Sequence, residues 1–334
     1  MRIFSIILVL LLSISIYAEK IKIKFASLAP RGSTWLNVME EYNQIIQEES
    51  KEKISFRIYP GGVSGNEIDV LRKIRMGQLH AGGFTGVALG EILPEVRIFD
   101  APFLLNSNEE ADLIQQLLFD DFSAKFEKKN FILLGWAEVG FVYIFTKKPV
   151  TSIQDLNGIK MWMWEGDPVA KATFDALGFK PIPMNVTDVL TALQTGMIDG
   201  LYVSPLGAVS LQWYTKINYM LELPLANAIG AILISKDIWQ TLTPEEQRMM
   251  RGYGRTYMQK LIKLSREDNM KSIEEMKKKG LKLTTIKNPK DLETIRLAGE
   301  KARTKMAQSL YSPELLKKVE DTLNEFRAKN NSPN

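Results

Sequence analysis

Apolar residues recur at every second position in two short stretches near the start of the chain, 21–25 and 54–58, and this alternation predicts two strands. The continuous apolar run 131–136 predicts a third, fully buried strand. Between these stretches, apolar residues recur at helical spacing and predict helices over 33–49, 68–76 and 109–128.

The second half of the chain repeats this alternation of strands and helices. Over 159–164 the apolar residues Ile159, Met161 and Met163 alternate with Lys160, Trp162 and Trp164. This pattern predicts a strand with Trp162 and Trp164 on one face. Asp167 followed by Pro168 predicts the start of a helix that ends at Gly178. Two further strands are expected over 197–203 and 228–235, and two further helices over 187–195 and 312–327. The capping box at 243–246 predicts the start of another helix. The order of elements favours an α/β fold with mostly parallel strands.

The first residues have the pattern of a secretory signal peptide. Arg2 precedes a run over 3–17 that carries no charge, and the small residue Ala18 comes before the charged pair Glu19-Lys20. The apolar run is short for a membrane anchor, which needs about 20 residues. We therefore expect segment 1–18 to be a signal peptide cleaved near Ala18, and a periplasmic mature protein.

Composition narrows the possible functions. The formal net charge of +4 is spread along 334 residues without a basic block, so nucleic acid is an unfavoured partner, and there is no cysteine to form a disulfide. His80 is the only histidine and has no nucleophile motif beside it. No dinucleotide-binding or Walker motif is present either. The sequence thus predicts neither an enzyme nor a cofactor, and a mature chain of this length suits two domains.

Five motifs occur in order along the mature chain. They are K-F-A-S-L-A-P-R-G-S-T-W (24–35), Y-P-G-G-V-S-G-N-E (59–67), F-D-A-P-F-L-L (99–105), D-L-N-G-I-K (155–160) and A-L-G-F-K-P-I-P-M-N-V-T-D-V-L-T-A-L-Q-T-G-M-I-D-G (176–200). Together they resemble the motifs of TRAP transporter solute-binding proteins of the DctP type, and the resemblance covers essentially the whole mature chain.

The resemblance implies a two-lobed α/β fold like that of periplasmic binding proteins, with a central sheet in each lobe and a ligand cleft between them. We expect lobe I to comprise 19–141 plus about 226–265, and lobe II to comprise 142–225 plus about 266–330. The implied partners are a small-molecule ligand and the membrane permease subunits of a TRAP transporter, and an additional periplasmic accessory protein is a further candidate. A permease-independent sensor or lipid chaperone of the same fold is an alternative.

Two positions depart from the family pattern. The strand after D-L-x-G usually carries an arginine that clamps a ligand carboxylate, and Trp162 stands in its place. A second arginine often follows G-F in the crossing strand, and here Val142 follows Gly140-Phe141. A guanidinium donates two charge-assisted hydrogen bonds to a carboxylate, whereas an indole offers one neutral donor and a large apolar face. The sequence therefore favours a neutral or hydrophobic ligand.

The alternative is a carboxylate ligand held by a different cation, for which Arg97 and Lys160 are the first candidates. Trp213 and Trp239 are expected to be packing residues. The positions expected to contact ligand are Trp35, Glu67, Phe84, Trp136, Glu138, Val142, Trp162, Trp164, Asn185 and Tyr202.

Overall fold

The structure is a computed structural model that describes residues 20–330. The expected signal peptide, its cleavage site and the last four residues lie outside this range. No helix within 20–330 is both long and apolar enough to cross a bilayer.

Eight strands form one large curled sheet in the order β10-β8-β4-β9-β3-β1-β2, with β7 pairing on β4. Their bounds are β1 Ile21–Ala26, β2 Ile54–Tyr59, β3 Ala81–Thr85, β4 Phe131–Thr146, β7 Gly200–Val203, β8 Tyr219–Leu221, β9 Ala226–Ser235 and β10 Lys282–Thr284. The short strands β5 (Trp162–Trp164) and β6 (Ile182–Met184) form a separate parallel pair.

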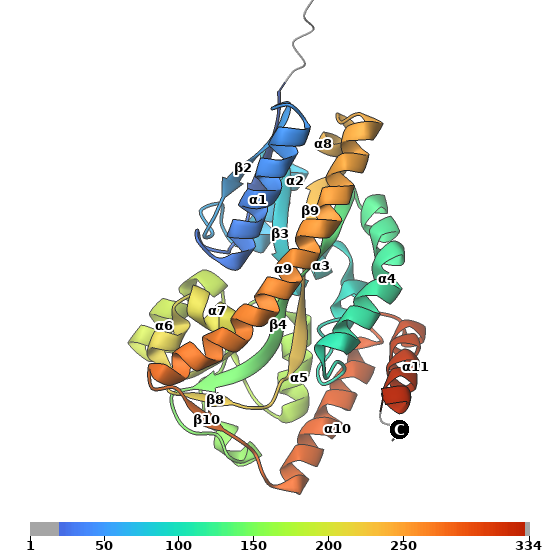
Figure 1. Ribbon diagram of the computed structural model, residues 1–334. Helices are drawn as coiled ribbons and strands as arrows, with labels where there is room; N and C mark the ends of the chain where they lie inside the picture. The colour runs from blue at the N-terminus through green and yellow to red at the C-terminus, as the bar shows by residue number, and fades with distance from the viewer. Residues whose placement is uncertain (1–19, 331–334) are drawn as a thin grey trace, which may run out of the picture.

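The sheet is mixed, and this corrects the expectation of mostly parallel strands with a separate sheet in each lobe. β1 pairs in parallel with β2 and β3, but β9 is antiparallel to both β3 and β4. The physical reason is the length of β4 and β9. Both run through the middle of the molecule and join all strands except β5 and β6 into one sheet (Figure 1).

Helices cover the sheet and connect its strands. The α-helices are α1 Thr34–Glu49, α2 Glu67–Arg75, α3 Gly86–Ile92, α4 Asn108–Lys128, α5 Pro168–Leu177, α6 Val189–Thr195, α7 Pro205–Ser210, α8 Lys236–Gln240, α9 Pro244–Lys278, α10 Pro289–Met306 and α11 Pro313–Asn330. The 3₁₀ turns are η1 Pro94–Ile98, η2 Ile153–Leu156, η3 Val186–Asp188 and η4 Trp213–Lys216.

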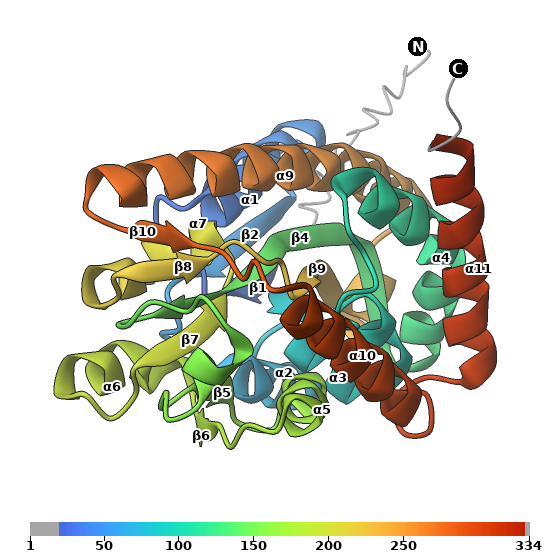
Figure 2. The ribbon, with the colours of Figure 1, turned by 90° about the horizontal axis from the view of Figure 1, so that it is seen from below.

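The 35-residue helix α9 is the longest element, and it packs against β4, α1 and α7. Figures 1 and 2 show it crossing the molecule from the region of α1 to that of α6 and α7. It begins as the sequence predicts, at a capping box in which Thr243 accepts from the Glu246 N–H and Glu246 accepts from the Thr243 N–H.

Candidate ligand-binding cavity

A cavity of about 540 Å³ lies between two sets of elements that are far apart in the sequence. One wall comes from the segment that follows β1 and from α1, α2, β3, α3 and η1. The opposite wall comes from β5, α5, η3, α6, β7 and α7. Residues of β4 and β9, including Val142 and Ala228, lie between the two walls. A ligand in this cavity can therefore contact both sets of elements at once.

Aromatic side chains cluster on the β5–β7 wall. The ring of Trp162 stacks on that of Tyr202 with centroids 5.1 Å apart, and it meets Trp213 edge-on at 5.3 Å. The ring of Trp164 lies 6.3 Å from that of Trp162, so both tryptophans project from one side of β5, as the alternation predicted. Trp162 is 2% exposed, and its Nε1 donates to the Met184 carbonyl at 3.0 Å. It is thus a packed wall residue with its one donor already used.

Arg97 holds a buried ion-pair network at the edge of this aromatic wall. Its Nε donates to Asp100 at 2.7 Å and its Nη2 donates to Asp167 at 2.9 Å. The Nη1 group donates to no side chain or carbonyl within 20–330, and Arg97 borders the cavity. Among the described lining residues Arg97 is the only lysine or arginine, against the carboxylates of Glu67, Asp100 and Asp167.

Two glycines make room for this network. A Cβ at Gly90 would lie 2.8 Å from Cδ of Arg97, and a Cβ at Gly86 would overlap Asp100. The two glycines are four residues apart on α3, so they present one bare helix face to the η1 turn. Burial lowers the pKa of Arg97, but the charges of Asp167 and Asp100 outweigh it and hold the pKa above its usual range. Burial raises the pKa of Asp100 to about 6 despite the attraction of Arg97.

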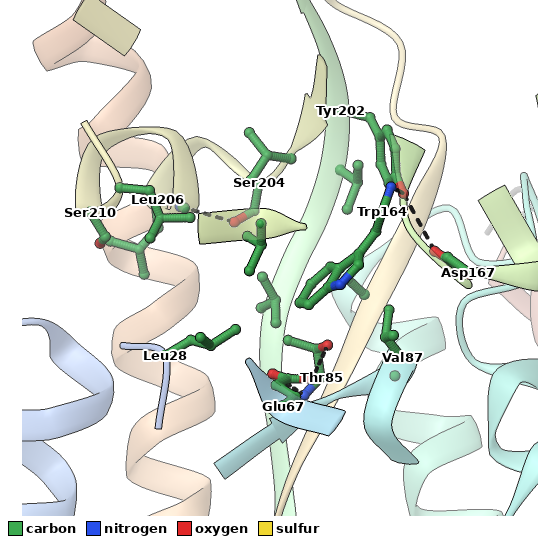
Figure 3. Close-up of a pocket in the computed structure, with 18 of the residues that line it drawn as sticks. Leu28, Glu67, Thr85, Val87, Trp164, Asp167, Tyr202, Ser204, Leu206 and Ser210 are labelled. Atoms are coloured by element: carbon green, nitrogen blue, oxygen red, sulfur yellow. Dashed lines mark hydrogen bonds between the residues drawn. The ribbon is translucent and has the colours of Figure 1, made fainter. Parts of the chain in front are cut away.

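A second polar group borders the cavity, and the charge of Arg97 acts on it. Glu67, on the first turn of α2, accepts from the Thr85 N–H at 2.9 Å and from the Thr85 hydroxyl at 2.8 Å. Burial raises the pKa of Glu67 to about 7, although both Thr85 donors act to lower it. Figure 3 shows this pair across the cavity from Trp164, with Tyr202 and Asp167 farther along the same wall as Trp164.

The rest of the lining is mainly apolar. Leu28, Val87 and Leu206 face the cavity in Figure 3. Ser204 also faces it, and its hydroxyl oxygen accepts the Gly207 N–H at 3.1 Å and caps α7. The arrangement offers a mainly apolar volume that is bordered by one cation, Arg97, and by the carboxyl groups of Glu67, Asp100 and Asp167. Within 20–330 no three histidine or carboxylate side chains are grouped so that they could hold a metal ion.

Six of the ten positions expected from the sequence border the cavity: Trp35, Glu67, Val142, Trp162, Trp164 and Tyr202. Trp35 reaches it from α1, and its ring lies over the sheet where a Cβ at Gly230 would come within 2.6 Å of Cη2. Glycine at this position of β9 therefore gives the indole its place.

Two of the remaining four positions are core residues away from the cavity. Phe84 is fully buried on the face of β3 that packs on α2 and α3 residues. Trp136 lies within 6.4 Å of four phenylalanine rings, and its Nε1 donates to the Gln115 carbonyl. Neither side chain borders the cavity.

The other two make polar contacts elsewhere. Glu138 is fully buried and accepts from Arg266 of α9 at 2.6 Å, so its charge is already paired. Asn185 accepts from the side chain of Asn66 at 2.9 Å and donates to Glu165, linking the two walls outside the cavity lining.

Trp213 and Asp167 are two of the lining residues that the sequence analysis does not identify as such. Trp213 was assigned to packing, and it packs against Trp162 but also borders the cavity. Asp167 was assigned only as a helix cap. It does cap α5, since it accepts the Val169 N–H at 3.0 Å, and it also reaches Arg97. Of the two suggested cations, Arg97 borders the cavity, whereas Lys160 is exposed and donates to the Gly196 carbonyl.

The family model and the curated relative that this chain matches are both solute-binding proteins. Residues 25–309 match the model of the bacterial extracellular solute-binding protein family 7. The 2,3-diketo-L-gulonate-binding periplasmic protein of Escherichia coli is 26% identical over 254 residues, which cover 74% of this chain and 75% of that protein.

Solved structures of TRAP periplasmic solute-binding proteins have the same fold. The Pseudomonas putida protein with bound D-glucuronate is 25% identical, with a TM-score of 0.81 over 90% of this chain and 96% of that one. The Ralstonia eutropha protein is 22% identical, with a TM-score of 0.84 over 91% of this chain and 99% of that one.

Proposed function

The chain belongs to family 7 of the bacterial extracellular solute-binding proteins and is a TRAP-type periplasmic solute-binding protein, and we propose that its solute is a small organic acid with an apolar body. In this proposal the acid group binds Arg97 and the apolar body fills the aromatic part of the cavity. The expectation of a neutral or hydrophobic ligand gives way to the alternative of a carboxylate held by a different cation.

The observation that carries the proposal is Arg97 itself, which is the only cation among the described lining residues and whose Nη1 has no hydrogen-bond partner within 20–330. A guanidinium with an unused N–H group is a strong donor to a carboxylate in a site of low dielectric constant. The apolar walls would contribute about 25 cal/mol for each Å² of ligand surface that they bury. A ligand with one acid group and a hydrocarbon or branched body uses both features.

The relatives support an acid. The Escherichia coli relative is described as binding 2,3-diketo-L-gulonate, and the Pseudomonas putida protein holds D-glucuronate; both solutes are carboxylates. Those solutes carry several hydroxyl groups, whereas this cavity has few free polar groups. The proposed solute therefore shares the acid group of the relatives' ligands and is less hydroxylated.

A neutral apolar solute is the second candidate, because Arg97 already has two carboxylate partners. Thermal unfolding with a ligand panel separates the two. Branched and straight monocarboxylates of four to eight carbons, and their neutral amides, are added to the purified protein. A ligand present at 100 times its dissociation constant stabilises by about 2.7 kcal/mol. We expect a rise in melting temperature with an acid and none with its amide; the reverse result would favour the neutral candidate.

Variants of the two candidate cations test the assignment of Arg97. Arg97→Lys keeps a positive charge beside Asp100 and Asp167 but loses the planar fork, and it should weaken acid binding at least ten-fold. Lys160→Gln is the matched control, since Lys160 is exposed and borders a different part of the surface. Equal losses in both variants, or none in Arg97→Lys, would contradict the assignment.

The remaining parts of the proposal concern partners and location. We propose that the mature protein works in the periplasm, hands its solute to the permease subunits of a TRAP transporter, and can use an accessory periplasmic protein. Loss of solute uptake in a strain lacking only this chain, with the permease genes intact, is the expected result. Unchanged uptake would favour the permease-independent alternative.

A further inference from the structure

Asp167 lies at a position from which it can affect which solutes bind Arg97. Arg97 belongs to η1 on one wall of the cavity, and Asp167 is the N-cap of α5 on the other. The Arg97 Nη2 to Asp167 Oδ1 hydrogen bond of 2.9 Å therefore joins two segments that are 70 positions apart in the sequence. Both side chains are buried, with 4% and 6% of their surface exposed.

Asp167 is held in this position by three donors. Besides Arg97, its Oδ1 accepts the Val169 N–H at 3.0 Å, and its Oδ2 accepts the Tyr202 hydroxyl at 3.4 Å. Asp100 fixes the other side of the guanidinium through Nε, and its own Oδ1 accepts the Ile229 N–H at 2.8 Å. Two carboxylates thus occupy Nε and one of the two N–H groups of Nη2, and among residues 20–330 Nη1 has no hydrogen-bond partner.

We propose that Asp167 is a specificity-determining residue that restricts the cavity to solutes with a single acid group. This inference rests on the proposed function, because it concerns the acid that would bind Arg97. A carboxylate that used both Nη1 and Nη2 would have to share Nη2 with Asp167. A second acid group on the solute would add charge to a lining that already has three carboxylates and one cation.

Asp167→Asn tests this role with little disturbance of the fold. Asparagine has the same shape and is as good an N-cap as aspartate. Its Oδ1 can still accept from both the Val169 N–H and Arg97 Nη2, so this variant removes the charge of Asp167 and keeps its hydrogen bonds. Asp167→Ser is a second variant that also caps the helix but no longer reaches as far as Arg97. Asp175→Asn is the matched control, because it makes the same charge change on the exposed face of α5 outside the cavity lining.

Titration calorimetry would measure binding of hexanoate, 4-methyl-2-oxopentanoate, succinate and adipate to these four proteins. We expect the wild type and Asp175→Asn to bind the monocarboxylates and not the dicarboxylates. Both Asp167 variants should bind the monocarboxylates at least ten-fold more tightly and gain measurable affinity for at least one dicarboxylate. An unchanged ligand profile in folded Asp167→Asn and Asp167→Ser would overturn the inference.

The outcomes separate this inference from the proposed function. If the wild type binds no acid but the Asp167 variants do, both are overturned as stated, because Asp167 then excludes every acid and does not select those with a single acid group. If the wild type binds monocarboxylates and the variants behave identically, the proposed function stands and the role of Asp167 is overturned. If no protein of the set binds an acid, both are overturned, since a released Arg97 should attract one.

Discussion

Trp162 occupies the position where the family resemblance implies a ligand-binding arginine, and here its ring is part of a packed aromatic cluster. Tyr202 and Trp213 contact two of its sides, and the Met184 carbonyl takes its N–H. An arginine at this position would need a carboxylate partner, but the indole is satisfied without a ligand. The substitution therefore changes a charged binding group into a structural one that also borders the cavity.

Trp162→Ala should be costly for folding. Removing a large buried aromatic side chain typically costs about 3–5 kcal/mol, and here the Met184 carbonyl also loses its donor. Trp164→Ala is the control in the same strand, and because Trp164 is only half-buried we expect a loss of about 1–2 kcal/mol. Urea unfolding of both variants measures the difference. Equal losses would show that Trp162 is not the better packed of the two.

Glu67 should make stability depend on pH. Its pKa is raised to about 7 by burial, from a usual value near 4.5, so folding favours the protonated form. This favourable contribution is complete below about pH 4.5 and is lost as the pH rises through 7. Glu67→Gln removes the titrating group, so its stability relative to wild type should grow between pH 5 and pH 8, by up to about 3 kcal/mol. Urea unfolding at the two pH values measures this. A difference that does not change with pH would contradict it.

The residues that line and support the cavity show what a sequence pattern can and cannot predict. Trp162 and Trp164 were placed on one face by simple alternation, and they do lie together. Asp167 was recognised as a cap from the Asp-Pro pair, because capping is a local interaction. Its contact with Arg97 is not local, and no periodicity encodes it. The pair of glycines on α3 was the available signal, but it becomes meaningful only once η1 is known to pack there.

At the scale of elements, α9 is tied to β4 by ion pairs as well as by apolar packing. Arg266 of α9 donates to the fully buried Glu138 of β4 and to the more exposed Asp112 of α4. Glu138 also accepts from the side chains of Gln115 and Asn227. A buried carboxylate needs such partners, since leaving it unpaired costs several kcal/mol.

Arg266→Met should therefore destabilise the protein by about 3–5 kcal/mol, because it leaves the Glu138 carboxylate buried without a cation. The double variant Arg266→Met with Glu138→Gln should recover much of that loss, since no charge is left buried and the amide oxygen can still accept from one of Gln115 and Asn227. Asp112→Asn is the control and should cost less than about 1 kcal/mol, because Asp112 is largely exposed. Additive losses in the double variant would contradict a direct coupling between Arg266 and Glu138.

Helix starts were predicted better than strand pairing. The N-caps of α1, α5 and α9 lie where the sequence placed them, because the capping side chain is close to the N–H groups that it accepts from. β4 was expected over 131–136 and extends to Thr146, and its antiparallel pairing with β9 was not foreseen. Apolar runs indicate burial but not the direction of the neighbouring strand, and that direction is set by connections far along the chain.

At the scale of the whole molecule, the two predicted lobes stay a proposal, and we propose in addition that they close on a solute in the cavity. Its walls come from two sets of elements joined through β4, β9 and α9, so a solute between them contacts both. A solute that contacts both walls only when they are close together binds that state more tightly and shifts the population toward it.

We expect small-angle scattering to give a smaller radius of gyration for the protein saturated with a bound monocarboxylate than for the ligand-free protein. Asp167→Asn removes the charge from the contact between Arg97 and the N-cap of α5, so the ligand-free variant should have a larger radius than the ligand-free wild type, and the change on binding should increase. An equal radius in all four samples would show that the walls are fixed, and that the cavity admits its solute without a movement of the two sets of elements.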